Sequence, residues 1–243
     1  MSDKQTVDAS ASTPRLFALH HLTSLALVML GLGLFAFIVL AGEMLEGHTM
    51  QFDRWMLMAL RTPGDPSDPI GPLWVEEMFR DFTALGGVGV LSLITLLSVI
   101  YLWLQGLHRI AIFTLLAILG GLLLSTLLKT SFDRPRPDLV THGSLVYTSS
   151  FPSGHSMLSA VVYLTGAALL AMVHKTRRLR IYLIGCAILT TLLVGISRIY
   201  LGVHWPSDVL AGWSAGSAWA AASWLFAHWL REILGSDWEG KNN

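Results

Sequence analysis

Hydrophobic residues along the chain gather in long runs that contain no charged residue, with polar residues confined to the segments between them. Six runs have the roughly 20 residues that a helix needs to span a bilayer. They cover residues 22–42, 83–104, 110–128, 156–173, 181–197 and 209–230. Only helices satisfy every backbone polar group within such a run, and none of the runs alternates as a barrel strand does. The pattern predicts an all-α fold, a bundle of six transmembrane helices.

The long polar segment from 43 to 82 lies between the first two runs. Its piece 51–61 places four apolar side chains at helical spacing, with Asp53, Arg54 and Arg61 off that stripe. The stripe consists of Phe52, Trp55, Met56 and Leu60. We expect a helix lying along the membrane interface, then a loop without regular structure over the proline-rich residues 62–72, then a second short helix over 73–82.

The remaining pattern predicts one domain with two short tails. Residues 1–21 begin polar and are expected to form a disordered cytoplasmic tail, 22–235 the membrane domain, and 236–243 a short C-terminal tail. The last apolar run is rich in small residues, including Gly212 and Gly216 four positions apart. Such residues allow close helix approach, and we expect them to pack inside the bundle.

Composition supports a lipid environment and limits the partners. The chain is 53% hydrophobic and 13% charged, whereas soluble domains carry about 25% charged residues. Sixteen basic residues balance sixteen acidic ones, so no net charge favours a nucleic acid. The single cysteine, Cys186, cannot form an internal disulfide.

Lysine and arginine are most concentrated between the fourth and fifth runs, in HKTRRLR at 174–180. Short loops of this kind face the cytoplasm. Both termini are then expected inside the cell, and the segment from 43 to 82 outside the cytoplasmic membrane. The same parity puts three polar segments together on the outer face: KTSFDRPRP at 129–137, SFPSGHS at 150–156 and SRIYLGVHWPSD at 197–208.

These three segments have the chemistry of an oxyanion receptor. Lys129, Arg136 and Arg198 supply positive charge that suits a phosphoryl group. Ser153 is a favourable N-cap, and the N–H groups of Gly154 and His155 behind it provide further anion contacts. Arg134 also precedes a proline, but its spacing from Lys129 differs from that of Arg136, and we interpret it as an interfacial or substrate-proximal charge.

Two histidines and one carboxylate complete the set. His204 lies four residues before Asp208, close enough for the carboxylate to bind one ring nitrogen and leave the other to attack phosphorus. His155 then protonates the leaving oxygen. Either imidazole is capable of either task, and the carboxylate partner decides the assignment in favour of His204 as the nucleophile.

At these residues the chain resembles the type 2 phosphatidic acid phosphatases, the lipid phosphate phosphatases whose site is similar to that of the vanadium haloperoxidases. The family pattern reads K-x6-R-P, then P-S-G-H, then S-R-x5-H-x3-D. Lys129, Arg136 and Pro137 match the first part, 152–155 the second, and Ser197, Arg198, His204 and Asp208 the third. The resemblance implies a phosphohistidine on His204 oriented by Asp208, His155 as acid and then base, and no metal or other cofactor. It also implies lipid phosphates as substrates: phosphatidylglycerophosphate, phosphatidate or undecaprenyl diphosphate.

Other functions fit the sequence less well. A phosphotransferase that passes the same intermediate to a lipid hydroxyl stays open. A transporter or channel would place ionisable residues in the middle of its crossings, and these have none. A serine hydrolase based on Ser153 lacks the G-x-S-x-G elbow, and a zinc ion on His155, His204 and Asp208 would be repelled by three neighbouring cations. The oligomeric state is left undetermined.

Overall fold

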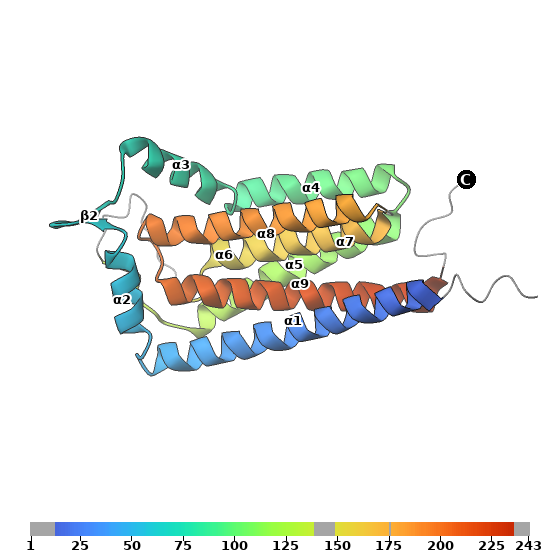
Figure 1. Ribbon diagram of the computed structural model, residues 1–243, viewed down its shortest axis with the longest axis horizontal. Coiled ribbons are helices and arrows are strands. Elements are labelled where there is room, and N and C mark those ends of the chain that lie inside the picture. Colours follow the sequence, from blue (N-terminus) through green and yellow to red (C-terminus); the bar gives the residue numbers. More distant parts are fainter. Residues whose placement is uncertain (1–12, 139–148, 175, 236–243) are drawn as a thin grey trace, which may run out of the picture.

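The computed structural model describes residues 13–138, 149–174 and 176–235, and these are almost entirely helical. Long helices lie side by side as a bundle (Figure 1). They are α1 (Thr13–Leu45), α4 (Val88–Leu104), α5 (His108–Ser131), the consecutive α6 (Gly154–Ser159), π-helical η1 (Ala160–Leu164) and α7 (Thr165–Val173), then α8 (Arg177–Tyr200) and α9 (Pro206–Leu234). The predicted helical class is confirmed.

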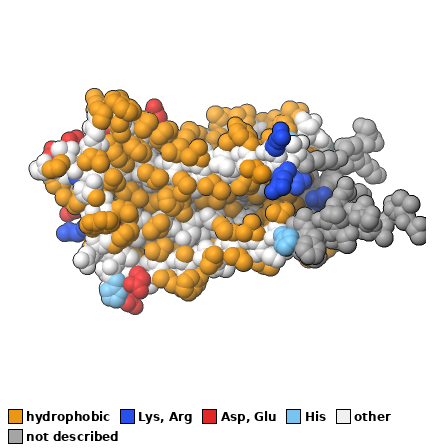
Figure 2. Space-filling model, in the orientation of Figure 1, with side chains coloured by type: hydrophobic (Ala, Val, Ile, Leu, Met, Phe, Trp, Pro, Cys, Tyr) orange, Lys and Arg blue, Asp and Glu red, His pale blue; other side chains and the backbone are white. Residues whose placement is uncertain are grey.

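The number of membrane crossings is confirmed only in part. Among the described residues, α1, α5, α6 to α7 and α8 each contain a segment long and apolar enough to span a membrane, and α3 (Leu73–Ala84) with α4 counts as a fifth if taken as one bent span. The 29-residue α9 packs against α1 but is not among these helices. Its serine and tryptophan residues lower its mean hydropathy. Figure 2 shows hydrophobic side chains over most of one face, with lysine and arginine side chains near the start of α8.

The segment between α1 and α4 contains regular structure that the sequence analysis missed. After α2 (Met50–Met58), strands β1 (Arg61–Thr62) and β2 (Asp65–Pro69) form a small antiparallel hairpin, where we had expected an irregular loop. Strand β2 contains Pro66 and Pro69. In a two-stranded sheet each strand pairs along one side only, so it tolerates proline, which lacks the N–H that a central strand needs. Gly64 turns the chain with φ +92°, a conformation that favours glycine. The two predicted short helices are confirmed as α2 and α3.

Helix α2 buries a charged residue that lies off its predicted apolar stripe. Asp53 and Leu57 are fully buried, whereas Phe52 and Trp55 are exposed. The ionic and hydrogen-bond contacts of Asp53, described below, account for its burial.

Two helix boundaries also differ from the prediction. The expected run 83–104 is broken after α3, and α4 continues at 50° to it. The break falls at Leu85–Gly87, where the chain makes a turn with hydrogen bonds from the N–H groups of Gly86 and Gly87. Helix α1 begins at Thr13, so residues 13–21 are helical where a disordered tail was expected; residues 1–12 and 236–243 lie outside the described part of the chain.

Small residues of α9 pack inside the bundle, as predicted. A Cβ atom on Gly212 would lie 2.7 Å from the backbone oxygen of Ser153, and one on Gly216 would lie 2.6 Å from Cβ of Ala160. Gly33 of α1 approaches the backbone oxygen of Ser214 as closely, at 2.8 Å. These contacts bring α9 against both α1 and the helix that begins with α6, and so fix the position of its N-terminal turn.

Candidate active site

All the site residues named in the sequence analysis lie at one end of the bundle, where α5 and α8 finish and α6 and α9 begin (Figure 1). Lys129 lies in the last turn of α5, Arg136 just after it, Ser153 to His155 at the start of α6, Arg198 in the last turn of α8, His204 in the loop after α8, and Asp208 in the first turn of α9. Segments far apart in the sequence thus meet in one place.

The three cations border His155. This imidazole lies within electrostatic range of Lys129, Arg136, Arg198 and His204. A Cβ atom on Gly154 would lie 3.0 Å from Cε of Lys129, so the missing side chain there leaves room for the lysine. Nη1 of Arg198 donates to Oγ1 of Thr83 at 2.8 Å, while its buried Nε has no hydrogen-bond partner among the described residues.

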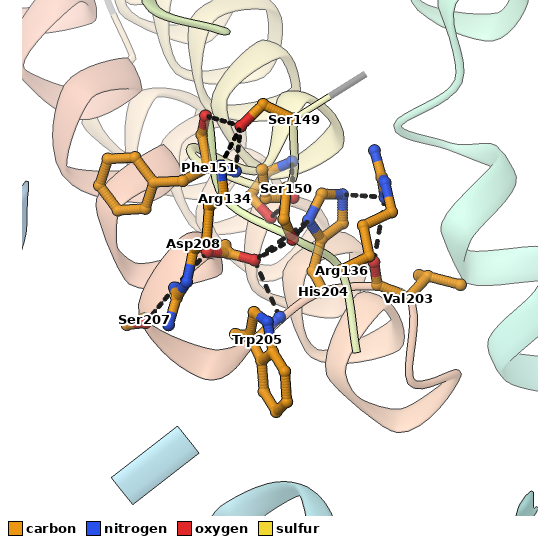
Figure 3. Close-up of polar contacts among 12 residues, drawn as sticks. Arg134, Arg136, Ser149, Ser150, Phe151, Val203, His204, Trp205, Ser207 and Asp208 are labelled. Atoms are coloured by element: carbon orange, nitrogen blue, oxygen red, sulfur yellow. Dashed lines mark hydrogen bonds and ion pairs between the residues drawn. The ribbon is translucent and has the colours of Figure 1, made fainter. Parts of the chain in front are cut away.

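His204 is almost fully buried, and its two ring nitrogens face different partners (Figure 3). Nε2 lies 3.2 Å from Nη1 of Arg136, and Nδ1 lies 3.4 Å from Oδ2 of Asp208. Because a guanidinium only donates hydrogen bonds, Nε2 presents its lone pair to Arg136. The ring proton is then on Nδ1, toward the carboxylate. The unprotonated nitrogen therefore faces a cation of the site.

The carboxylate of Asp208 is held through both oxygens. Oδ1 accepts from Nη1 of Arg134 at 2.5 Å, and Oδ2 accepts from the backbone N–H of Trp205 at 2.9 Å and from Oγ of Ser150 at 2.5 Å. The Trp205 contact is the one that an acidic residue makes at the third position of a helix. Since the Ser150 hydroxyl donates to Asp208, its oxygen is free to accept from Nδ1 of His204, 3.3 Å away.

Burial lowers the pKa of two site residues that lie in the connections between helices, His204 and Arg136. Removal from water lowers the pKa of His204 to about 4, against the opposing effect of Asp208. His204 is therefore neutral at pH 7. Burial also lowers the pKa of Arg136, a guanidinium whose ordinary value is so high that it stays charged.

Ser153 is the N-cap of α6, as the sequence predicted. Its side-chain oxygen accepts from the N–H and the hydroxyl of Ser156, at 3.5 and 2.9 Å. Its own N–H donates to the backbone oxygen of Asp208 at 3.0 Å, which ties the start of α6 to the first turn of α9. Gly154 and His155 occupy the first two helical positions, whose N–H groups have no carbonyl partner within a helix.

Arg134 was interpreted as an interfacial or substrate-proximal charge, and its burial contradicts the first of these alternatives. It is 6% exposed and lies between two carboxylates, Asp208 and Asp53. Asp53 was missed because it lies off the apolar stripe of its helix, where the local pattern gives no sign of burial. Ser150 and Thr83 were also missed. Ser150 lies just before the Pro-Ser-Gly-His motif, a weak signal that was present, whereas nothing near Thr83 in the sequence points to Arg198.

Comparison of the sequence with known proteins identifies the family of the chain. Residues 110–232, slightly more than half of the chain, match the model of the PAP2 superfamily. The matched range contains the full set of residues from Lys129 to Asp208 described above. The chain belongs to the PAP2 superfamily.

Three curated relatives are similar over shorter stretches. Phosphatidylglycerophosphatase B of Bacillus subtilis is 45% identical over 39% of this chain, undecaprenyl-diphosphatase of Sulfolobus acidocaldarius 44% over 28%, and lipid A 1-phosphatase of Rhizobium etli 37% over 39%. These matches cover 46%, 29% and 40% of the relatives, so the chain matches less than half the length of each.

The fold is similar to that of a solved membrane protein. A crystal structure of a transmembrane PAP2-type phosphatidylglycerolphosphate phosphatase from Bacillus subtilis superimposes with a TM-score of 0.72 at 29% identity. The superposition covers 83% of this chain and 96% of that one, so it extends beyond the matched range 110–232 into the N-terminal half.

Proposed function

We propose that this chain is an integral membrane phosphatase that hydrolyses lipid phosphate monoesters or isoprenoid diphosphates through a phosphohistidine on His204. The observation that carries the proposal is the orientation of the His204 ring. Its Nε2 lone pair faces Arg136 at 3.2 Å, while Nδ1 faces Asp208. A histidine so oriented attacks a phosphorus atom whose oxygens are bound by the surrounding cations.

The reaction takes two steps. In the first, Nε2 of His204 forms a bond to phosphorus as the bond to the lipid oxygen breaks, and His155 gives its proton to that oxygen. In the second, His155 takes a proton from water as the water attacks the phosphohistidine, which releases phosphate and restores His204. Lys129, Arg136 and Arg198 stabilise the phosphoryl oxygens in both steps. Asp208 supports the positive charge that develops on the ring.

A lipid substrate fits the position of the site. It lies at the end of a bundle whose helices expose large hydrophobic side chains, such as Leu104 at 78% and Phe35 at 67%. Trp74 and Leu73 of α3, also widely exposed, suit the headgroup region beside it. The names of the relatives support phosphatidylglycerophosphate and undecaprenyl diphosphate as candidates, and phosphatidate shares their phosphate group.

A panel of these lipids tests the activity on purified protein. We expect phosphate release that persists in EDTA and is inhibited by vanadate, because cationic side chains supply the charge that a metal would otherwise bring. With ³²P-labelled substrate, rapid quenching should trap label on the wild type and none on His204→Ala. Activity lost in EDTA and restored by magnesium or zinc, or label retained in His204→Ala, would contradict the mechanism.

Six crossings with the site on the outer face complete the proposal. The arginines at the start of α8 support a cytoplasmic location for that end, and the site lies at the other end of α8. In a Cys186→Ala background, cysteine at Ser67 should react with an impermeant maleimide in intact cells, and cysteine at Thr176 should not. Both positions are exposed. The reverse pattern would place the site in the cytoplasm and make lipids of the inner leaflet the substrates.

A further inference from the structure

A buried ionic network lies behind the candidate active site and reaches a helix outside the range matched by the family model. Arg134 donates through Nη1 to Oδ1 of Asp208 at 2.5 Å and through Nη2 to Oδ2 of Asp53 at 2.6 Å. The two carboxylates are fully buried, and Arg134 nearly so. One guanidinium thus joins α2 to the first turn of α9.

Ser207 makes the connection rigid. Its backbone N–H donates to Oδ1 of Asp53 at 2.8 Å, and its hydroxyl donates to Oδ2 of Asp53 at 2.6 Å. The same hydroxyl oxygen accepts from Nη1 of Arg134 at 2.8 Å. Both oxygens of Asp53 are therefore bound to the residue next to Asp208, and Thr49 of the same segment also contacts Arg134, at 3.1 Å.

The bonds to Arg134 restrict the rotation of the Asp208 carboxylate. With Oδ1 engaged by the guanidinium, Oδ2 is left to face Nδ1 of His204, where it is also held by Trp205 and Ser150. Because Arg134 is buried, its second terminal nitrogen, Nη2, also needs a hydrogen-bond acceptor, and a second carboxylate provides one. Asp53 meets that need and keeps the plane of the guanidinium fixed.

We propose that Asp53 and Arg134 are positioning residues for the reaction, and that they act only through Asp208. They hold its carboxylate in the orientation that fixes the tautomer of His204 and stabilises the ring as it becomes charged. This proposal rests on the proposed function, because it assigns Asp208 the role of partner to a nucleophilic His204. Neither side chain is expected to contact the substrate.

Asp53→Asn is the most informative variant. It keeps the shape of the side chain, and it leaves Arg134 paired with Asp208 rather than leaving a carboxylate unpaired. We expect the rate of phosphoenzyme formation and kcat to fall about tenfold, with KM within about twofold of the wild type, because the phosphate-binding cations are unchanged. Arg134→Lys should behave in the same way, since lysine keeps the charge but not the two-pronged geometry. Arg54→Gln, an exposed neighbour on α2, serves as the matched control and should match the wild type.

A double-mutant cycle separates positioning from a general loss of folded protein. In an Asp208→Asn background, Asp53→Asn should cost no more than about twofold, because its effect passes through the missing carboxylate. A tenfold loss in both backgrounds, or wild-type kcat in Asp53→Asn, would overturn the proposal. So would a failure of both Asp53→Asn and Arg134→Lys to fold, judged by their elution and melting in detergent, since the network would then serve the fold alone.

The proposed function is tested separately by the wild type. If the wild type forms no phosphohistidine on His204, the proposed function fails, and the positioning role falls with it. If the wild type forms it while the double-mutant cycle shows independent effects, the proposed function stands and only the positioning role is rejected.

Discussion

The two halves of the molecule contribute to the site in different ways. Residues from α5 to α9, which contain the range matched by the family model, supply the groups that we propose act on the phosphate. These are the three cations and the two histidines, with Asp208 as the partner of His204. The segment from α2 to the turn before α4 supplies none of these. Instead, two of its polar side chains accept hydrogen bonds from arginines of the second half. Asp53 accepts from Arg134, and Thr83 accepts from Arg198.

Under the proposed mechanism, the chemical groups and their alignment come from separate parts of the chain. The helices of the second half are connected so that the charged groups lie at helix ends or in the adjoining loops, at the same end of the bundle. A helix end fixes the backbone of a residue but leaves a long side chain several rotamers. Contacts from the first half select among these rotamers, so changes there are expected to lower the rate without removing the reaction.

The largest difference in rate between variants of the two halves is expected when a histidine is replaced by alanine. His155→Ala should lower phosphate release by about 10²–10⁴-fold, because no other described side chain is assigned to protonate the leaving oxygen. His48→Ala, in the exposed turn before α2, should leave the rate unchanged although His48 contacts Glu43 and Glu46. Phosphate release by purified variants in detergent provides the measurement. Equal losses in both variants would contradict the division.

The sequence predicted the second half far better than the first. Motif spacing and the parity of the crossings were enough to bring Lys129, His155 and His204 together, since each lies in a polar segment that borders a long apolar run. In the first half the apolar stripe located helix α2 but did not indicate that Asp53, off the stripe, is buried. The burial of Asp53 depends on Arg134, which is remote in sequence, so it had no local signal.

Stability should depend on pH through the second half of the chain. The pKa of His204 falls from an ordinary 6.5 to about 4 on folding, so between these values the unfolded chain binds a proton that the folded protein does not. Stability is therefore unaffected above pH 7 and is lost as the pH falls through this window. By pH 5 the loss amounts to about 2 kcal/mol.

His204→Gln removes the titrating group and provides the comparison. Its melting temperature in detergent should fall less between pH 7 and pH 5 than that of the wild type, while both lose the same amount through other groups. Parallel curves for the two proteins would show that His204 titrates alike in the folded and unfolded states, and would remove the basis for a neutral nucleophile held by burial.

The smallest effect concerns the turn between α3 and α4, where the first half touches His155. A methyl group on Gly86 would overlap Cγ1 of Val194 and lie 3.3 Å from Cβ and Cδ2 of His155. The hydroxyl of Tyr163 donates to the backbone oxygen of Leu85 at 2.8 Å, which holds the turn against the helix that carries His155. Any added volume at Gly86 must therefore move the turn, Val194 or the imidazole.

We expect Gly86→Ala to lower kcat about tenfold, because displacement of an acid by a fraction of an ångström weakens proton transfer to the leaving oxygen. Gly89→Ala, one turn away with nothing within 4 Å of the added methyl, should match the wild type. Adding Val194→Ala to Gly86→Ala makes room for the methyl group and should recover part of the rate. A Gly86→Ala enzyme as fast as Gly89→Ala would show that the turn does not position His155, and that the first half acts on the site through Asp53 and Thr83 alone.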